Sequence, residues 1–382
     1  MVPDDFASDA AGTVRKMPSA YYAFIPTRPP ERLDLREVTQ PLAEASAALG
    51  QLSGLGVTVQ LGLLPNPYLF IAHSVRREAA ASTKIEGTKA GITELYIDEV
   101  LTEATRPEND VAEIKNYIAA MEAGRRKLQD LPFASRLVRE IHAILLNDVR
   151  GRERRPGEFR TSQNWIGGAS PTNALFVPPP PDELWRCIGD WERFANLRRV
   201  MPELVQCAIM HAHFETIHPF LDGNGRIGRL LITLFLIERG LLSEPLLYVS
   251  SYIEKHKAAY YETLQRTRTH GDWIGWVAYF LEAIRSSAAD AVNNARALLT
   301  LRAELHANPA LAKKARERRL IDELFSNPYV TVQHARKLLG VSTVTATRAI
   351  ETLQALGILE ERTGKAWGRI WLAKPILRAL EE

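Results

Sequence analysis

The segment HPFLDGNGRIGR, residues 218–229, gathers the residue types in this chain that are best suited to chemistry. Gly223, Gly225 and Gly228 leave backbone N–H groups unobstructed before a predicted helix, which is how proteins cradle phosphate oxygens. Arg226 and Arg229 lie three residues apart, so within a helix they project from one face toward the same anion. The spacing therefore predicts a site for a polyphosphate.

A carboxylate and a histidine complete this segment. Asp222 adjoins the glycines, and Mg²⁺ is commonly held by one carboxylate together with phosphate oxygens and waters. His218 has an unperturbed pKa of about 6.5, which suits the removal of a proton from a hydroxyl group. Together these residues predict nucleotidyl or phosphoryl transfer. The alternative is a tight connection between two helices, which would be the better interpretation of an isolated GNG.

The segment resembles the signature of the Fic family, which runs His, any, Phe, any, Asp or Glu, Gly, Asn, Gly, Arg, two of any kind, Arg. Every specified position matches: His218, Phe220, Asp222, Gly223, Asn224, Gly225, Arg226 and Arg229. The resemblance extends to YYAFIPTRPP at 21–30, which is similar to the N-terminal region of larger Fic proteins. It also includes residues 247–265, which resemble the helix that closes the nucleotide pocket.

The resemblance implies an enzyme that transfers AMP from ATP to a Ser, Thr or Tyr hydroxyl of a target protein or of itself, releasing pyrophosphate. It makes His218 the general base, Phe220 a buried anchor of the loop, and Asp222 the ligand of Mg²⁺. Arg229 would reach the γ-phosphate. The remaining phosphate-binding groups would be Asn224, Arg226 and the amides of Gly223 and Gly225. Phosphorylating relatives carry Lys at the position of Gly225, so AMP transfer is favoured here.

A second motif, STKIEG at 82–87, matches the family's inhibitory pattern of Ser or Thr, three of any kind, Glu, then Gly or Asn. Ser82 and Glu86 are four residues apart and therefore share one helical face, and Gly87 is typical of a helix end. The resemblance implies that Glu86 competes for Arg229 and removes the partner of the γ-phosphate. The alternative is a solvated glutamate at the end of a helix.

Three further predictions depend on position. Residues 174–177, ALFV, stand where the family carries a short β-hairpin flap, whose strand edge would align a target segment; Leu175 and Phe176 would clamp a side chain. The flap residues are Ala174, Leu175, Phe176 and Val177. An ordinary surface hairpin is the alternative. His213 lies close enough to the signature to touch the nucleotide, and Tyr252 is a candidate for the adenine pocket, with core packing as the alternative.

The elements that position these residues are mainly helices. Apolar spacing predicts helices at about 35–50, 70–87, 93–102, 110–128, 135–146, 182–197, 203–216, 228–239, 253–267 and 273–299. Prolines make residues 1–33 an extended or irregular arm, and PNPYLF at 65–70 breaks the chain before the next helix. Residues near 315–357 read as three helices, with Ser342 as an N-cap, followed by a hairpin, the order of a winged helix-turn-helix.

We therefore expect a mainly α chain: a Fic-type helical bundle with a short β-hairpin flap, and a C-terminal winged helix-turn-helix domain. The expected division is an N-terminal arm and inhibitory helix at 1–110, a Fic catalytic core at 111–300 and the winged helix at 301–382. With 46% hydrophobic and 24% charged residues, 382 residues can bury a substantial core, so a disordered or fibrous chain is excluded.

The net charge of +3 is unevenly distributed. Residues 301–382 carry +5, whereas residues 1–300 carry −2. DNA binding through residues 301–382 is therefore a second hypothesis, in which the core of a DNA-binding regulator serves as a nucleotide sensor. The predicted recognition helix holds only Arg348 as a basic residue, so contacts in a homodimer or with a target are at least as well supported.

Compartment follows from what the sequence lacks. Cys187 and Cys207 form no disulfide or zinc pattern, and MVPDDFASDA resembles no export signal. The longest apolar run, 230–237, is far shorter than the roughly 20 residues that cross a bilayer. We therefore expect a cytoplasmic protein without a membrane partner.

Overall fold

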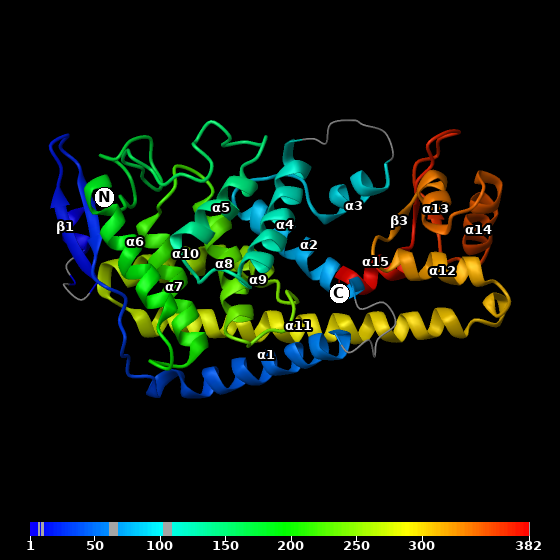
Figure 1. The fold of residues 1–382 in the computed structure, drawn as a ribbon, viewed down its shortest axis with the longest axis horizontal. Helices are drawn as coiled ribbons and strands as arrows, with labels where there is room; N and C mark the ends of the chain where they lie inside the picture. Colours follow the sequence, from blue (N-terminus) through cyan, green and yellow to red (C-terminus); the bar gives the residue numbers. More distant parts are fainter. Residues whose placement is uncertain (7, 9–10, 61–67, 102–108, 382) are drawn as a thin grey trace.

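The computed structural model describes residues 1–6, 8, 11–60, 68–101 and 109–381. The chain folds into an elongated helical body, with a small β-sheet at one end and a second helical unit at the other (Figure 1). Helix α11, Trp273–Ala307, runs along most of this length, and α1, Thr39–Gln60, packs beside it. The predicted mainly helical fold is thus confirmed.

The main apolar core lies between α1, α11 and the helices that surround the signature segment. The intervening helices are α2 Tyr68–Ile85, α3 Ile92–Val100, α4 Asn109–Lys127, α5 Ser135–Leu145, α6 Pro181–Asn196, α7 Glu203–Ile217, α8 Asn224–Glu238, α9 Val249–Lys255 and α10 Lys257–His270. Helices α7 and α8 are buried on nearly all sides, which is why their sequences are apolar almost throughout. This burial gives the loop between them a rigid support.

The N-terminal arm is extended where its prolines predict an extended or irregular segment, but its pairing into a sheet was not predicted. After a 3₁₀ turn at Pro3–Phe6, strands β1 Gly12–Lys16 and β2 Tyr22–Pro26 pair antiparallel, with Gly12 opposite Pro26. Proline is tolerated there because Pro26 stands at the end of a strand in a two-stranded sheet. Two further 3₁₀ turns lie at Arg36–Val38 and Pro309–Leu311.

Residues 315–381 form what we call the C-terminal unit. It comprises α12 Ala315–Leu324, β3 Tyr329–Val330, α13 Val332–Leu339, α14 Thr343–Ala355, β4 Glu360–Glu361, β5 Trp371–Leu372 and α15 Lys374–Glu381. The three strands are antiparallel in the order β3-β5-β4. Ser342 caps α14 by accepting a hydrogen bond from the Thr345 N–H. Helix α15 was not expected, and the winged-helix assignment stays a prediction.

The expected division of the chain meets continuous helices at both borders. The border at 110/111 falls in the first turn of α4, and the border at 300/301 falls within α11. The apolar cluster of the main body runs from Val38 to Val292, and a separate cluster begins at Leu298. Of the chain break predicted at 65–70, residues 65–67 lie outside the described residues, and residues 68–70 form the start of α2. Among the described helices, none has both the length and the apolar character needed to span a membrane.

Candidate active site

The signature segment forms a turn between two buried helices. His218 ends α7 in the left-handed conformation, with φ of 49°, and its N–H donates to the Phe214 carbonyl. Gly223 precedes α8 with φ of 77°, a conformation that glycine adopts without strain. Helix α8 begins at Asn224, so its first N–H groups, which lack acceptors within the helix, stand beside His218 and Asp222. The turn therefore joins a histidine to an anion-binding helix start.

Side chains from other parts of the sequence hold this turn in shape. The Asn224 amide accepts from the Phe220 N–H and donates to the Phe220 carbonyl, both at 2.8 Å. Asn164 donates to the carbonyls of His218 and Phe220, at 3.0 and 2.9 Å. Arg160 donates to the His218 carbonyl at 3.0 Å. These hydrogen bonds hold the backbone of the turn, and none of them involves the His218 ring.

A stacked pair of rings, His142 and Phe220, supports the turn. The His142 ring lies parallel to the Phe220 ring at 3.6 Å, and Phe220 is fully buried. The His142 Nδ1 accepts from the Gly157 N–H, so its Nε2 donates to the Asp222 carbonyl at 3.0 Å. Burial lowers the pKa of His142 to about 4, which keeps this tautomer at neutral pH. Phe220 therefore lies where the signature predicts an anchor.

His218 is held as a neutral imidazole. Burial, followed by the positive charges of Arg268 and Arg160, lowers the pKa of His218 to about 3. Its Nδ1 is 3.9 Å from Glu215 Oε2, and burial raises the pKa of Glu215 to about 7. At pH 7 the ring is therefore unprotonated and able to accept a proton. The side chain keeps 21% of its surface exposed, so a hydroxyl group can approach it.

The two arginines of the signature lie in different environments. Arg226 is buried between two carboxylates, 3.3 Å from Asp222 Oδ1 and 3.5 Å from Glu113 Oε2. Arg229 is equally buried, one turn further along α8, and points toward α2. Both guanidinium groups lie near the start of the helix, the position that suits a chain of phosphates.

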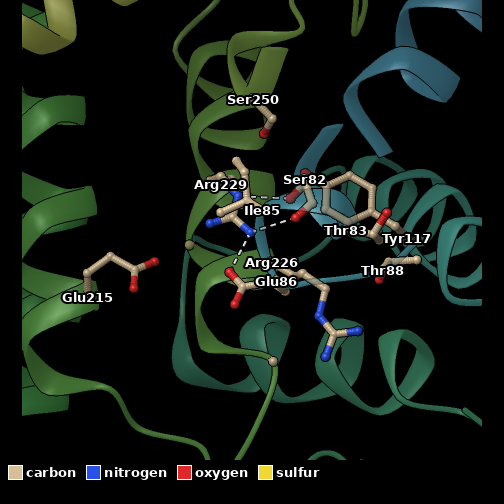
Figure 2. Close-up of polar contacts among 12 residues, drawn as sticks. Ser82, Thr83, Ile85, Glu86, Thr88, Tyr117, Glu215, Arg226, Arg229 and Ser250 are labelled. Atoms are coloured by element: carbon tan, nitrogen blue, oxygen red, sulfur yellow. Dashed lines mark hydrogen bonds and ion pairs between the residues drawn. The ribbon is translucent and has the colours of Figure 1, made fainter. Parts of the chain in front are cut away.

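Ser82 and Glu86 meet Arg229 at the end of α2 (Figure 2). Arg229 Nε donates to Ser82 Oγ and its Nη2 donates to the Ser82 carbonyl, both at 2.9 Å. The same Nη2 forms an ion pair of 2.8 Å with Glu86 Oε1. Burial is the largest influence and would raise the pKa of Glu86 and lower that of Arg229, but the neighbouring groups of opposite charge, above all Glu86 and Arg229 for each other, together outweigh it, so the net shift is downward for Glu86 and upward for Arg229. The pair is therefore charged.

The segment that follows Glu86 is fixed to α4. Gly87, with φ of 94°, turns the chain, and the Thr88 hydroxyl donates to Glu113 Oε2 at 2.6 Å. Arg150 donates to the same oxygen at 3.3 Å and to the Glu86 carbonyl at 3.4 Å. One buried carboxylate thus contacts the turn after Glu86, the loop at Arg150 and the signature arginine Arg226.

Comparison with known proteins identifies the family. The Fic/DOC family model matches residues 132–236, and the Fic/DOC family N-terminal model matches residues 39–126. The chain belongs to the Fic/DOC family. Over 107 residues it is 38% identical to a probable protein adenylyltransferase of Aquifex aeolicus, and over 129 residues it is 35% identical to the protein adenylyltransferase Fic of Aedes aegypti. These matches cover 27% and 33% of this chain, and 31% and 23% of those relatives.

Solved structures of Fic proteins share the fold. A Fic family protein from Desulfovibrio desulfuricans superposes with a TM-score of 0.57 at 20% identity, covering 90% of this chain and 98% of that one. A Fic domain containing signaling protein from Bacteroides thetaiotaomicron gives a TM-score of 0.52 at 20% identity, covering 65% and 97%. At this identity the likeness establishes the fold alone.

The Fic signature offers Asp222 as a candidate metal ligand. Its carboxylate is 37% exposed, and it accepts from the Gly223 N–H at 2.6 Å through one oxygen. Within the described part of the chain, no cluster of three His, Cys, Asp or Glu residues could hold a metal ion. One accessible carboxylate beside an anion-binding helix start fits Mg²⁺, which binds proteins through few carboxylates and keeps phosphate and water ligands.

His213 and Tyr252, the two residues predicted to contact the nucleotide from outside the signature, make other contacts in the structure. His213 is fully buried on the other side of α7, where its Nε2 bonds the Thr27 carbonyl at 3.0 Å. His218 lies after the last residue of α7 in the left-handed conformation, so its side chain does not continue the helical face of His213. Tyr252 stacks on His256 at 4.0 Å and packs edge-on against Tyr279, so its part in an adenine pocket stays a prediction.

Asn224 and the flap also need correction. The side chain of Asn224 is bonded to Phe220 through both of its polar atoms, so of its donors only the backbone N–H is left for the predicted phosphate contact. The flap is a single antiparallel bridge between Ile166 and Phe176 rather than a hairpin. Phe176 is buried against Phe6 and Phe24 and cannot clamp a target, whereas Leu175 is 74% exposed. Ala174 and Val177 are also buried.

Sequence reasoning missed the residues that shape the turn and one aromatic residue near it. His142, Arg160 and Asn164 lie 54 to 80 positions from the groups they contact, and no local pattern announces such contacts. Tyr261 is 45% exposed. Burial of its hydroxyl, and then the negative charge of Glu86, raises the pKa of Tyr261 to about 12, and the charge of Arg229 opposes this shift. The paired aromatic residues at 260–261 were the available signal in the sequence.

Proposed function

We propose that this protein transfers AMP from ATP to a Ser, Thr or Tyr hydroxyl of a target protein, or of itself, and releases pyrophosphate. The observation that best supports this proposal is that a neutral His218 stands beside the start of α8, with Arg226 and Arg229 on that helix. The names of the curated relatives, which are protein adenylyltransferases, support the reaction. Their matches cover less than a third of those proteins, so the activity is a proposal for this chain.

In the proposed step, His218 takes the proton from the target hydroxyl, and the hydroxyl oxygen attacks the α-phosphorus of ATP. The bond from the α-phosphorus to its bridging oxygen breaks, and pyrophosphate leaves with the electron pair. Backbone N–H groups at Gly223, Gly225 and the α8 start, together with Arg226, would stabilise the negative charge. Asp222 would hold Mg²⁺, which supplies further charge neutralisation when bound.

The ion pair between Glu86 and Arg229 supports autoinhibition. Arg229 is the arginine that would bind the γ-phosphate, and its donors are engaged by Ser82 and Glu86. The Glu86 carboxylate would repel a phosphate placed beside it. ATP would therefore bind in a position that does not align the α-phosphorus with the target hydroxyl, and activity would require Glu86 to move away.

The test uses the full-length protein, Mg²⁺ and ATP labelled at the α- or the γ-phosphate. We expect Glu86→Gly to raise incorporation of the α-label into the protein itself at least tenfold, with no incorporation of the γ-label. Adding His218→Ala to Glu86→Gly should lower incorporation at least about a hundredfold, because a general base contributes that much or more. Equal incorporation by wild type and Glu86→Gly would contradict autoinhibition. Incorporation of the γ-label would indicate phosphate transfer instead.

A further inference from the structure

Glu86 lies between two helices that both touch the C-terminal unit. Helix α2 ends at Ile85, directly before Glu86, and α3 begins at Ile92. The short connection is held at Lys89, whose N–H donates to Asp110 Oδ2 at 2.8 Å. The distance and direction between α2 and α3 therefore determine where Glu86 stands. In Figure 1 both helices extend toward the C-terminal unit.

The C-terminal unit binds α3 through polar and apolar contacts. Asn327 Nδ2 donates to the Tyr96 carbonyl at 2.9 Å, and the Thr331 hydroxyl donates to the Val100 carbonyl at 3.2 Å. An apolar cluster joins the same two parts, and its buried members are Tyr96, Val100, Tyr329 and Leu372. The Val100 carbonyl lies at the last residue of α3, where the helix has no internal donor for it. The C-terminal unit thus completes the end of α3.

A single carboxylate links all three parts. Glu99 on α3 accepts from Arg76 of α2 at 2.9 Å through Oε1 and at 3.1 Å through Oε2. The same Oε2 accepts from Asn327 Nδ2 of the C-terminal unit at 3.1 Å. One residue further along α2, Arg77 donates to the Leu380 carbonyl of α15 at 3.4 Å. Both faces of the α2–α3 pair are therefore tied to residues 327–380.

A displacement at this junction would reach Glu86 through a short rigid path. Arg77 and Ser82 are five residues apart on α2, which is about 7.5 Å along a helix axis. Ser82 and Glu86 together hold Arg229, whose guanidinium is buried and anchored on α8. A small shift or rotation of α2 would therefore separate Glu86 from Arg229, because an ion pair at 2.8 Å tolerates little movement.

We propose that the C-terminal unit clamps α2 and α3 in the arrangement that keeps Glu86 on Arg229, and so sets the strength of autoinhibition. This inference rests on the proposed function and adds a regulator to it. The C-terminal unit has its own apolar core and contacts the catalytic half away from the signature segment. It therefore acts on the site through α2 and α3 without touching it.

The first test variant weakens the clamp by changing one side-chain atom of Asn327. Asn327→Asp keeps the oxygen that accepts from the Tyr329 N–H but replaces the Nδ2 donor by an oxygen facing Glu99. We expect this variant to raise incorporation of the α-label about threefold to tenfold in the otherwise wild-type protein. Coupling between sites commonly amounts to about 5- to 150-fold, and the loss of one contact among several places this effect at the lower end. In the Glu86→Gly background the same change should have no effect, because the inhibitory pair is already absent. Adding Glu99→Gln to Asn327→Asp removes the repulsion between the two carboxylates, but it weakens the contact with Arg76 and leaves an oxygen facing the Tyr96 carbonyl, so we expect it to restore only part of the inhibition.

Two further variants keep the test decisive. Thr331→Val removes the hydroxyl that bonds Val100, with almost unchanged volume, and should raise incorporation by a smaller factor. Val344→Ala, at a side chain 61% exposed on α14, is the matched control and should change nothing. If Asn327→Asp and Thr331→Val both leave incorporation at the wild-type level while Glu86→Gly raises it, the clamp is wrong and the proposed function stands. If Glu86→Gly is itself inactive, the proposed function fails and the clamp fails with it.

Discussion

Gly228 shows how closely the signature helix approaches its neighbour. A Cβ at this position would lie 2.1 Å from Glu215 Oε1 and 3.3 Å from His211 Cε1. Both neighbours are buried, and Glu215 lies next to the proposed base. The family signature leaves this position unspecified, yet here only glycine fits. The side chain that requires glycine is ten or more positions away, on α7.

We therefore expect Gly228→Ala to lower stability and activity, although helix propensity alone would favour alanine. Alanine is favoured over glycine in helices by about 1 kcal/mol, but displacing a buried carboxyl costs about 1–3 kcal/mol. We expect a lower thermal unfolding midpoint, and reduced incorporation of AMP in the Glu86→Gly background, because Glu215 would move against His218. Gly189→Ala is the matched control, since its Cβ would meet no atom within 4 Å, and it should leave both measurements equal or slightly improved. An unchanged midpoint for Gly228→Ala would contradict the argument.

At the scale of elements, the turn after α2 is held as firmly as the helix itself. Thr88 is buried, and its hydroxyl donates to Glu113, a carboxylate that α4 contributes from its own buried face. Because Glu113 also contacts Arg226, the inhibitory segment and the phosphate-binding helix share one anchor. Movement of Glu86 away from Arg229 must strain or break the bond from Thr88.

Thr88→Val should therefore weaken inhibition. The change removes the donor to Glu113 with almost unchanged volume, and a hydrogen bond to a charged group contributes about 1.5–3 kcal/mol, of which only a part would act on the position of Glu86. We expect incorporation of the α-label to rise about twofold to tenfold in an otherwise wild-type protein. Thr83→Val is the control, because the Thr83 hydroxyl bonds only carbonyls within α2, at Ala79 and Ala80. A rise of the same size in both variants would show that loss of packing, rather than the Glu113 bond, is responsible.

Most helices could be predicted because their apolar spacing is local information. The helix expected at 110–128, for example, is α4 at Asn109–Lys127. The helix expected at 253–267 is instead divided at His256, where α9 ends and α10 begins. The β1–β2 pair and α15 were missed because each is stabilised by contacts distant in sequence: Phe24 N–H to the Val177 carbonyl, and α15 against α11.

The site was predictable for a different reason. The chemistry of His218 to Arg229 lies within one turn and the helix after it, so spacing alone brings those residues together. Contacts made from other helices followed no such rule. His213 was expected at the nucleotide because it is near in sequence, but its helical position turns it toward Thr27. Arg160 and Asn164 were not anticipated because only the folded chain brings them to the turn.

At the scale of the whole molecule, the net charge of +5 on residues 301–382 is not gathered in the groove that this region forms. Three of its basic side chains are in ion pairs: Arg302 with Asp322, and both Arg362 and Lys374 with Glu360. A groove of about 770 Å³ lies between α13, α14 and the β4–β5 hairpin. Its lining combines one arginine, Arg369, with Glu351 and the 89% exposed Trp367. This composition is poor in the phosphate contacts that dominate the binding of duplex DNA.

We therefore expect the full-length protein to form no stable complex with a 30-base-pair duplex at about 150 mM salt. Nonspecific binding depends on the number of phosphates neutralised, and its logarithm falls with the logarithm of salt concentration in proportion to that number. Few unpaired basic residues on the outer face of α14 predict a shallow slope, measurable by fluorescence anisotropy from about 50 to 200 mM salt. Arg348→Ala and Arg369→Ala would then change the anisotropy little. A steep slope that Arg369→Ala reduces would instead support the hypothesis of a DNA-binding regulator, and repeating the measurement with Glu86→Gly and ATP would test whether that binding depends on the nucleotide site.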